Sequence, residues 1–442
     1  MDECPLVRGR HDLPRNIAML CSVARAATES DILSTVIRTA QTHPMFRTYF
    51  QPVPVKNREK RVREAVQSGV PTSGLYVEVI QPVSNVSCEI EEVRCSCEPL
   101  AFCDDAWLTV ESEARHIFDL RKAPLVRLKL FTNPLGEKVL LIVASRTIAS
   151  WWNLGELCLA FEEEASGREG ARAISKHSAF RNLWASQRAL RFWLGEWRSG
   201  TATPLTCRDL PIGLPRSGRP AERIRFVARQ WARTESDAVA RVAARNDVSR
   251  CAVILTACVR SLHELSQRPL MSLRVECDAS DLSNGRFTYV DINEHVMSVQ
   301  VPRNVSDDEL LSRVSSQATV VAQHALVSAD TVWQMAKKCM DMDGDRIVFQ
   351  YLRAEHNGPQ HMFDGPGWPI IDVAAGVTLR IGVLDAGDTI RIVLNYPDGH
   401  LRSGDAEEII QHIVDAVGRM SGAPVETTQI QQTASIEALC NV

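Results

Sequence analysis

The strongest constraint on the fold is that strand-sized and helix-sized segments occur together in both halves of the 442-residue chain. Between the halves, residues 199–222 are rich in Gly, Pro, Thr and Arg, a composition typical of a linker. Domains usually have roughly 150 residues, so this length favours two or three of them. We expect an α+β protein with an N-terminal domain at 1–198, a linker at 199–222 and a C-terminal domain at 223–442, each with a mixed β-sheet and helices.

Two segments of the N-terminal half predict a β-hairpin. Leu125–Phe131 alternates apolar and polar side chains, as a half-buried strand does. Lys138–Ala144 is apolar over nearly its whole length, which is typical of a strand in a sheet that is covered on both faces. Asn133–Gly136 lies between them and reads Asn-Pro-Leu-Gly, a turn sequence, so the two strands should pair.

Helical periodicity and capping residues predict several helices. Apolar residues recur at spacings of three and four over 32–40, and Ser30 or Asp31 is the expected N-cap. Ser306 should cap a helix at 307–324. The other expected elements are helices at 153–164, 179–197, 236–245, 250–265 and 403–420, strands at 76–80, 223–230, 273–277, 296–301 and 346–352, and a hairpin of 377–384 with 389–395.

Composition excludes several classes of protein. Fifty Lys and Arg against 54 Asp and Glu give a formal net charge of −4, which argues against a dedicated nucleic-acid binder. The sequence has no signal-peptide pattern and no apolar run of about 18 residues, so we expect no membrane span and a cytoplasmic protein with reduced thiols. The spacing of four neighbouring cysteines fits no common zinc pattern, so incidental cysteines are favoured over a metal site; they are Cys88, Cys95, Cys97 and Cys103.

Five segments, in this order, resemble the nonribosomal peptide synthetase condensation domains of the chloramphenicol-acetyltransferase-like superfamily. Thr42–Phe50 is similar to the family's RHPxLRTxF segment, and Phe118–Arg127 to its FDLxxGPLxR segment. Leu140–Leu157 falls where the family has a core strand, the catalytic loop and a helix. Gly344–Tyr351 is similar to the strand RNPLFQVMF, and Val377–Tyr396 to a later hairpin. The resemblance implies two acetyltransferase-like lobes arranged as a V, with a substrate tunnel between them.

The resemblance fails at the catalytic motif, which is HHxxxDG in the family. Ser145 and Arg146 stand at the two histidines, Ser150 at the aspartate and Trp151 at the glycine. The family's second histidine acts on the attacking amine or hydroxyl, whereas a guanidinium stays protonated and cannot accept a proton. Arg146 could instead donate hydrogen bonds to a carbonyl or an oxyanion. Arg47 matches the arginine that pairs with the missing aspartate.

The resemblance also indicates which residues would line the tunnel. These are Trp151, whose indole should narrow it, together with Arg47 and Asn293, the latter close to an asparagine of the family. His295 lies near that asparagine and is a candidate substitute base, although a capped or solvent-facing histidine is the simpler interpretation. The candidate catalytic residues are therefore Arg146, Ser145, Ser150 and His295.

Two functional hypotheses follow. In the first, the chain is a stand-alone condensation-domain-like protein of nonribosomal peptide or polyketide biosynthesis that has lost histidine-based condensation and acts by binding a carrier protein, synthetase module or partner enzyme. In the second, it is an active acyltransferase or cyclase on a carrier-bound or CoA-bound substrate, with Arg146 in place of the histidine. Neither needs a resident cofactor or metal, and the substrate would arrive on phosphopantetheine. A decaying paralogue is the third possibility, and the ordered apolar patterning argues against it.

Overall fold

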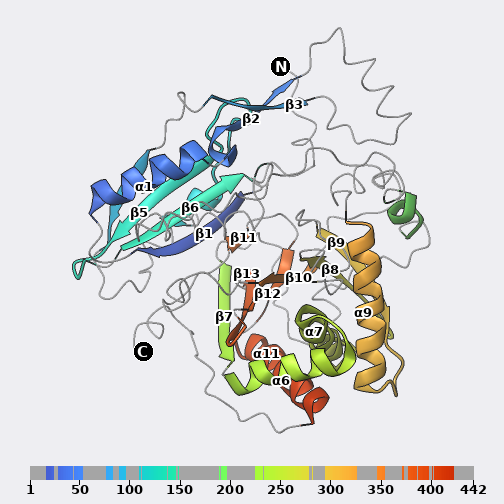
Figure 1. The fold of residues 1–442 in the computed structure, drawn as a ribbon. Helices are drawn as coiled ribbons and strands as arrows, with labels where there is room; N and C mark the ends of the chain where they lie inside the picture. Colours follow the sequence, from blue (N-terminus) through green and yellow to red (C-terminus); the bar gives the residue numbers. More distant parts are fainter. Residues whose placement is uncertain are drawn as a thin grey trace. The chain divides into compact units, whose positions relative to one another are not determined.

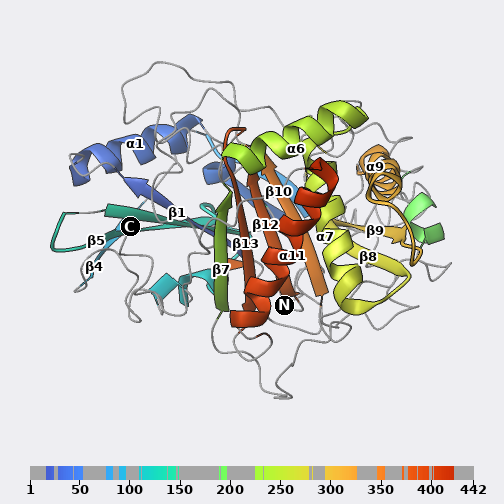
Figure 2. The same cartoon turned by 90° about the horizontal axis from the view of Figure 1, so that it is seen from below.

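The structure is a computed structural model. It describes residues 16–23, 28–42, 44–52, 76–82, 89–95, 109–110, 112–136, 138–145, 148, 189, 191–196, 224–231, 233–277, 281, 294–325, 346–353, 371–372, 377–385, 387–397, 401 and 403–422. Figures 1 and 2 show the elements that these residues form.

The chain forms two compact units. Unit 1 consists of Met1–Lys176, Asn357–Ala375 and Ser435–Val442, and unit 2 consists of His177–His356 and Gly376–Ala434. The expected linker lies outside the described residues, so the domain limits stay a prediction. Two described segments lie in the other unit than the expected domains predict. Residues 189–196, expected in the N-terminal domain, belong to unit 2, and a short strand at 371–372, expected in the C-terminal domain, belongs to unit 1.

Unit 1 contains a five-stranded sheet in the order β11-β1-β6-β5-β4. The predicted hairpin is confirmed, because β5 and β6 pair antiparallel across a turn in which Gly136 has a φ of +76°. β4 pairs parallel with β5, and β1 pairs antiparallel with β6 and β11. The bounds are β1 Asn16–Val23, β4 Ile90–Arg94, β5 Val126–Thr132, β6 Lys138–Ser145 and β11 Ile371–Asp372. β2 (Thr48–Pro52) and β3 (Tyr76–Ile80) form a separate antiparallel pair.

The first helix of unit 1 begins earlier than its apolar pattern predicts. α1 spans Glu29–Thr42 and is followed by the 3₁₀ helix η1, Pro44–Arg47. Thr28 and Asp31 exchange the hydrogen bonds of a capping box, in which the Asp31 backbone N–H donates to Thr28 Oγ1 at 3.2 Å and the Thr28 N–H donates to Asp31 Oδ2 at 2.9 Å. The predicted caps, Ser30 and Asp31, were therefore wrong, because both lie inside the helix.

Unit 2 contains a six-stranded mixed sheet in the order β7-β13-β12-β10-β8-β9. β10 pairs parallel with both β8 and β12, and the remaining pairs are antiparallel. The bounds are β7 Ile224–Trp231, β8 Leu270–Glu276, β9 Glu294–Gln300, β10 Arg346–Arg353, β12 Val377–Asp385 and β13 Ile390–Pro397. The helices are α6 Arg233–Asn246, α7 Arg250–Ser266, α9 Asp307–Gln323 and α11 Ser403–Ser421.

The helices of unit 2 lie over one face of this sheet, as Figure 2 shows for α6, α7 and α11. Alternate strand residues, such as Leu273, Phe349 and Ile381, point to that face and form the core with the helices. All the elements predicted in this half are present within a few residues, and Ser306 caps α9 by accepting from the Glu309 N–H. The α+β fold class is confirmed.

Candidate functional site

Of the four residues at the family's catalytic motif, the structure describes Ser145. It is the last residue of β6 and is buried; its backbone N–H donates to the Leu125 carbonyl at 3.0 Å, and its carbonyl accepts from the Ile148 N–H at 3.1 Å. Arg146, Ser150 and Trp151 lie outside the described residues, as does Asn293 in the other half of the chain. Their predicted roles therefore stay predictions.

Arg47 ends η1 in unit 1. Its Nη1 donates to the Gln81 carbonyl at 2.9 Å, while its buried Nε has no hydrogen-bond partner among the described residues. No carboxylate of the described residues forms an ion pair with Arg47. The guanidinium is thus held by a neutral carbonyl, and its buried Nε–H donor stays without a partner among the described residues.

His295 lies in the core of unit 2. It pairs with Val275 across β8 and β9, on the face that the helices cover, and is 3% exposed. Its ring stacks on Trp193 with centroids 4.7 Å apart and planes 5° from parallel, and Nε2 lies 3.4 Å from the Ala325 carbonyl. Trp193 in turn donates from Nε1 to the His324 carbonyl at 2.9 Å. Because His295 is buried, the interpretation as a solvent-facing histidine is wrong. Its role as a substitute base stays a prediction.

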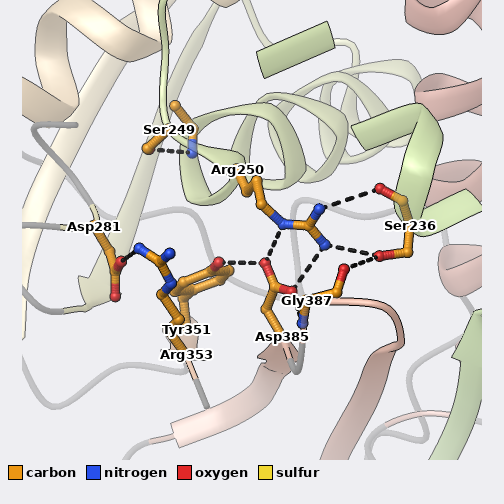
Figure 3. A network of polar contacts seen from close by, with 9 residues as sticks. Ser236, Ser249, Arg250, Asp281, Tyr351, Arg353, Asp385 and Gly387 are labelled. Carbon is orange, nitrogen blue, oxygen red and sulfur yellow. Dashed lines mark hydrogen bonds and ion pairs between the residues drawn. The ribbon is translucent and has the colours of Figure 1, made fainter. Parts of the chain in front are cut away.

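A cluster of ionisable side chains lies at the carboxyl ends of β10 and β12, and we call it the Asp385 network (Figure 3). Arg250, the first residue of α7, donates from Nε to Asp385 Oδ2 at 2.6 Å and from Nη2 to Oδ1 at 2.8 Å. The Tyr351 hydroxyl donates to Oδ2 at 2.6 Å, and the Gly387 N–H donates to Oδ1 at 2.9 Å. Ser236 accepts from Arg250 at 2.8 Å and donates to the Gly387 carbonyl at 2.7 Å.

Every polar group of the Asp385 network is thus paired. Burial raises the pKa of Tyr351 well above its ordinary value, and the nearby charge of Asp385 adds to this, so the phenol remains a donor. Burial alone would lower the pKa of Arg250, but its hydrogen bonds to Asp385 raise it. A carboxylate that accepts four hydrogen bonds has no free position for a substrate proton. The arrangement therefore joins α6, α7 and the β12–β13 turn, and it is structural.

The opposite face of the same sheet is polar yet buried. Successive strand residues alternate between faces, and the register brings together on this second face Arg274 and Glu276 of β8, Gln350 of β10, Arg380 of β12 and Asn395 of β13. All five are at most 5% exposed. We call this set the polar face. Polar side chains are rarely so buried unless they are paired or have a function.

One ion pair on the polar face neutralises two charges. Arg380 Nη1 donates to Glu276 Oε2 at 2.9 Å, reaching across β10 to β8, and lies 3.4 Å from Gln350 Oε1. Both partners of the ion pair are at most 2% exposed. The side chain of Arg380 is therefore directed away from β13, on the other side of β12.

Three amide atoms of the polar face lack hydrogen-bond partners among the described residues. Neither Asn395 Nδ2 nor Asn395 Oδ1 forms a hydrogen bond with any residue that the structure describes, and the same holds for Gln350 Nε2. A buried polar atom without a partner costs about 1–3 kcal/mol, so such atoms need an explanation. The sequence did not single out these residues, because polar residues at every second strand position usually indicate a solvent-facing side.

The described ranges contain neither a cluster of metal ligands nor a membrane-spanning helix. No group of three His, Cys, Asp or Glu side chains there could hold a metal ion, and Cys95, the one described member of the four-cysteine segment, is buried. None of the helices in these ranges has the length and apolar character needed to cross a bilayer.

Comparison with solved structures shows the fold. No family model matches the sequence, and no curated protein matches it. The first condensation domain of the calcium-dependent antibiotic synthetase, solved with a substrate analogue, superposes with a TM-score of 0.66 at 12% identity over 93% of each chain. The cyclization-docking bidomain of the EpoB synthetase from Sorangium cellulosum gives 0.66 at 12% identity over 93% of this chain and 81% of its own. The four-domain nonribosomal peptide synthetase AB3403 also gives 0.66 at 12% identity, over 94% of this chain and 31% of its own. The chain therefore has a condensation-domain-like fold.

Proposed function

We propose that the chain serves nonribosomal peptide or polyketide assembly by binding a carrier protein or a synthetase module, and that histidine-based condensation is lost. The observation that supports this most is Arg146, which stands at the position of the catalytic histidine in a chain with a condensation-domain-like fold. Imidazole accepts a proton near neutral pH because its pKa is about 6.5, whereas a guanidinium has no acceptor. The fold also occurs within the four-domain synthetase, which supports a partner of this class.

A second candidate is an active acyltransferase or cyclase. Arg146 retains several N–H donors, and donors aimed at a developing oxyanion are a large part of acyl-transfer catalysis. General-base catalysis typically contributes 10²–10⁴-fold, so a reactive amine acceptor could do without it. In this case Ser145 and Ser150 would help Arg146 to orient the substrate.

One experiment separates the two candidates. Purified full-length chain is titrated calorimetrically with the phosphopantetheine-loaded carrier proteins of its own gene neighbourhood, and the same mixtures are assayed for product by mass spectrometry. Association without turnover supports the binding role. Turnover that is lost in a folded Arg146→Ala variant and retained in a Ser34→Ala surface control supports the active enzyme. If no carrier or synthetase module associates, the proposal is wrong.

A further inference from the structure

We infer that Asn395, together with Gln350, forms a binding site for a neutral amide group of a ligand on the polar face of unit 2. The inference concerns which chemical group of the substrate is recognised, and it rests on the proposed function. It starts from two side chains that are buried and have hydrogen-bonding atoms without partners among the described residues: Asn395 is 5% exposed and Gln350 is 1% exposed.

The chemistry of the unpaired atoms defines the ligand group. Asn395 Nδ2 and Gln350 Nε2 are donors, and Asn395 Oδ1 is an acceptor. A secondary amide complements this set, because its carbonyl oxygen has two lone pairs and its N–H is one donor. A carboxylate fits less well, because it has no N–H to offer Asn395 Oδ1.

Three residues of the polar face are charged: Arg274 lies on β8, three strands away from Asn395 on β13, and the other two cancel. Arg380 and Glu276 form an ion pair with each other, so the fixed charges of this pair cancel. Coulomb interactions weaken with distance, so the described residues beside Asn395 present no unpaired charge that would favour a charged ligand over a neutral one. The recognition therefore depends on hydrogen-bond complementarity at the two amides.

The register places a glycine between the strands that carry the two amides. Gly382 of β12 is the cross-strand partner of Gln350 on one side and of Val393 on the other, and Asn395 lies two residues beyond Val393 on the same face. Gly382 has no side chain, and a glycine inside a strand commonly marks close approach by a ligand or another backbone. The side chain of Arg380 extends toward β8, away from this position.

The test uses two probes that differ in the amide alone. N-acetylglycyl-pantetheine and pentanoyl-pantetheine have the same pantetheine arm and the same acyl length of five main-chain atoms. Their dissociation constants are measured calorimetrically with the full chain and its variants. We expect the preference for the amide probe to fall about tenfold in Asn395→Leu and about threefold in Gln350→Met, since one hydrogen bond contributes roughly 0.5–1.5 kcal/mol.

A matched control lies on the same sheet face. Gln230 is exposed and accepts a hydrogen bond from Arg391 at 2.9 Å, so Gln230→Met should leave the preference unchanged. Asn395→Leu should also raise the melting temperature of the free protein, because it removes two unpaired buried atoms. A lower melting temperature would mean that the amide has a structural role, and this would overturn the inference.

The remaining outcomes are also decisive. If both probes bind and Asn395→Leu changes neither dissociation constant, no amide of either probe meets these side chains; the inference is wrong and the proposed function stands. If the variant weakens both probes equally, an amide of the shared pantetheine arm occupies the site, which supports the inference. If neither thioester binds, N-acetylglycinamide is titrated at millimolar concentration while the side-chain amide resonance of Asn395 is followed by NMR. A shift of that resonance supports the amide site and leaves the proposed function without support, whereas its absence overturns the inference.

Discussion

The two faces of the six-stranded sheet in unit 2 differ in whether their buried polar atoms have hydrogen-bond partners. On the helix-covered face, Asp385 accepts four hydrogen bonds from Arg250, Tyr351 and Gly387. On the polar face, the amide of Asn395 has no hydrogen-bond partner among the described residues. When every polar atom of a network is paired, none remains to bind a ligand. Unpaired buried atoms lower the stability of the free protein, and a ligand that pairs with them removes this cost. The difference indicates which face is structural and which face binds.

Among the substitutions, breaking the saturated network should have the largest effect. Arg250→Ala leaves the carboxylate of Asp385, 2% exposed, without its counter-charge. Removing one partner of a buried pair typically costs 3–5 kcal/mol, so we expect about 4 kcal/mol less stability in urea denaturation. Arg245→Ala is the matched control, because Arg245 pairs with Asp308 on the surface and should contribute at most about 1 kcal/mol. Equal losses in the two variants would contradict the structural assignment.

Removing one charge from the polar face should have the second largest effect. Glu276→Gln keeps an oxygen as a hydrogen-bond acceptor for Arg380 but removes the negative charge beside a fully buried cation. Hydrogen bonds to charged groups contribute about 1.5–3 kcal/mol, and we expect a loss in that range. Glu91→Gln, at an exposed carboxylate that pairs with Lys129, serves as the control. A loss below that of the control would show that Arg380 does not depend on Glu276.

Alkaline pH should lower the free energy of unfolding through titratable groups buried on the helix-covered side of the sheet. Burial raises the pKa values of Tyr351, Cys251 and Cys277, so the folded state keeps protons that the unfolded chain releases. Stability is therefore fully present below the ordinary values of 9.0 for the thiols and 10.0 for the phenol, and it falls as pH rises above them. Each group contributes about 1.4 kcal/mol per pH unit in this window. Denaturation at pH 8, 9 and 10.5 measures the fall.

Tyr351→Phe tests the share of the phenol in that decline. The variant loses the hydrogen bond to Asp385 at every pH, but it has no phenol to titrate. Its stability should therefore decline less steeply than that of the wild type above pH 10. Parallel curves for the two proteins would show that Tyr351 ionises in the folded state as it does in the unfolded chain.

The smallest predicted effect has the opposite sign. Asn395→Leu replaces an amide with two unpaired atoms by an apolar group of similar shape, which should stabilise the free protein by up to about 1 kcal/mol. Thermal denaturation without ligand measures the gain. Asn246→Leu is the control that should lose stability, because the Asn246 amide donates to the Val242 carbonyl at 2.9 Å. If both variants lose stability, the Asn395 amide is not an unpaired group, and the two sheet faces do not differ in the way described.

Periodicity predicted most of the fold because local patterns determine it. The hairpin of β5 and β6, the strand β3 and the Ser306 cap of α9 each follow from a few neighbouring residues. The two-residue strand β11 was not predicted, since its pairing with Ile17 and Ala18 of β1 joins segments far apart in the chain. Such long-range pairing leaves no local signal in the sequence.

The candidate site was less predictable. The resemblance pointed to Arg146 and Trp151, which lie outside the described residues, and to His295, which the structure places in a stack with Trp193. The polar face depends on four strands, and β8, β10 and the hairpin of β12 and β13 meet through non-local pairing. Gln350, Arg380 and Asn395 therefore appear in sequence as isolated polar residues within apolar segments. The alternation of polar and apolar residues along these strands can be seen in the sequence, but the burial of the polar ones cannot.

The most direct test is a crystal structure of the full chain with N-acetylglycyl-pantetheine. We expect the amide of the acyl group to lie about 3 Å from Asn395 Nδ2 and Oδ1, at hydrogen-bond distance, while the Asp385 network is unchanged. Ordered water at Asn395 with the acyl group bound elsewhere, or a ligand that displaces Arg250 from Asp385, would contradict it.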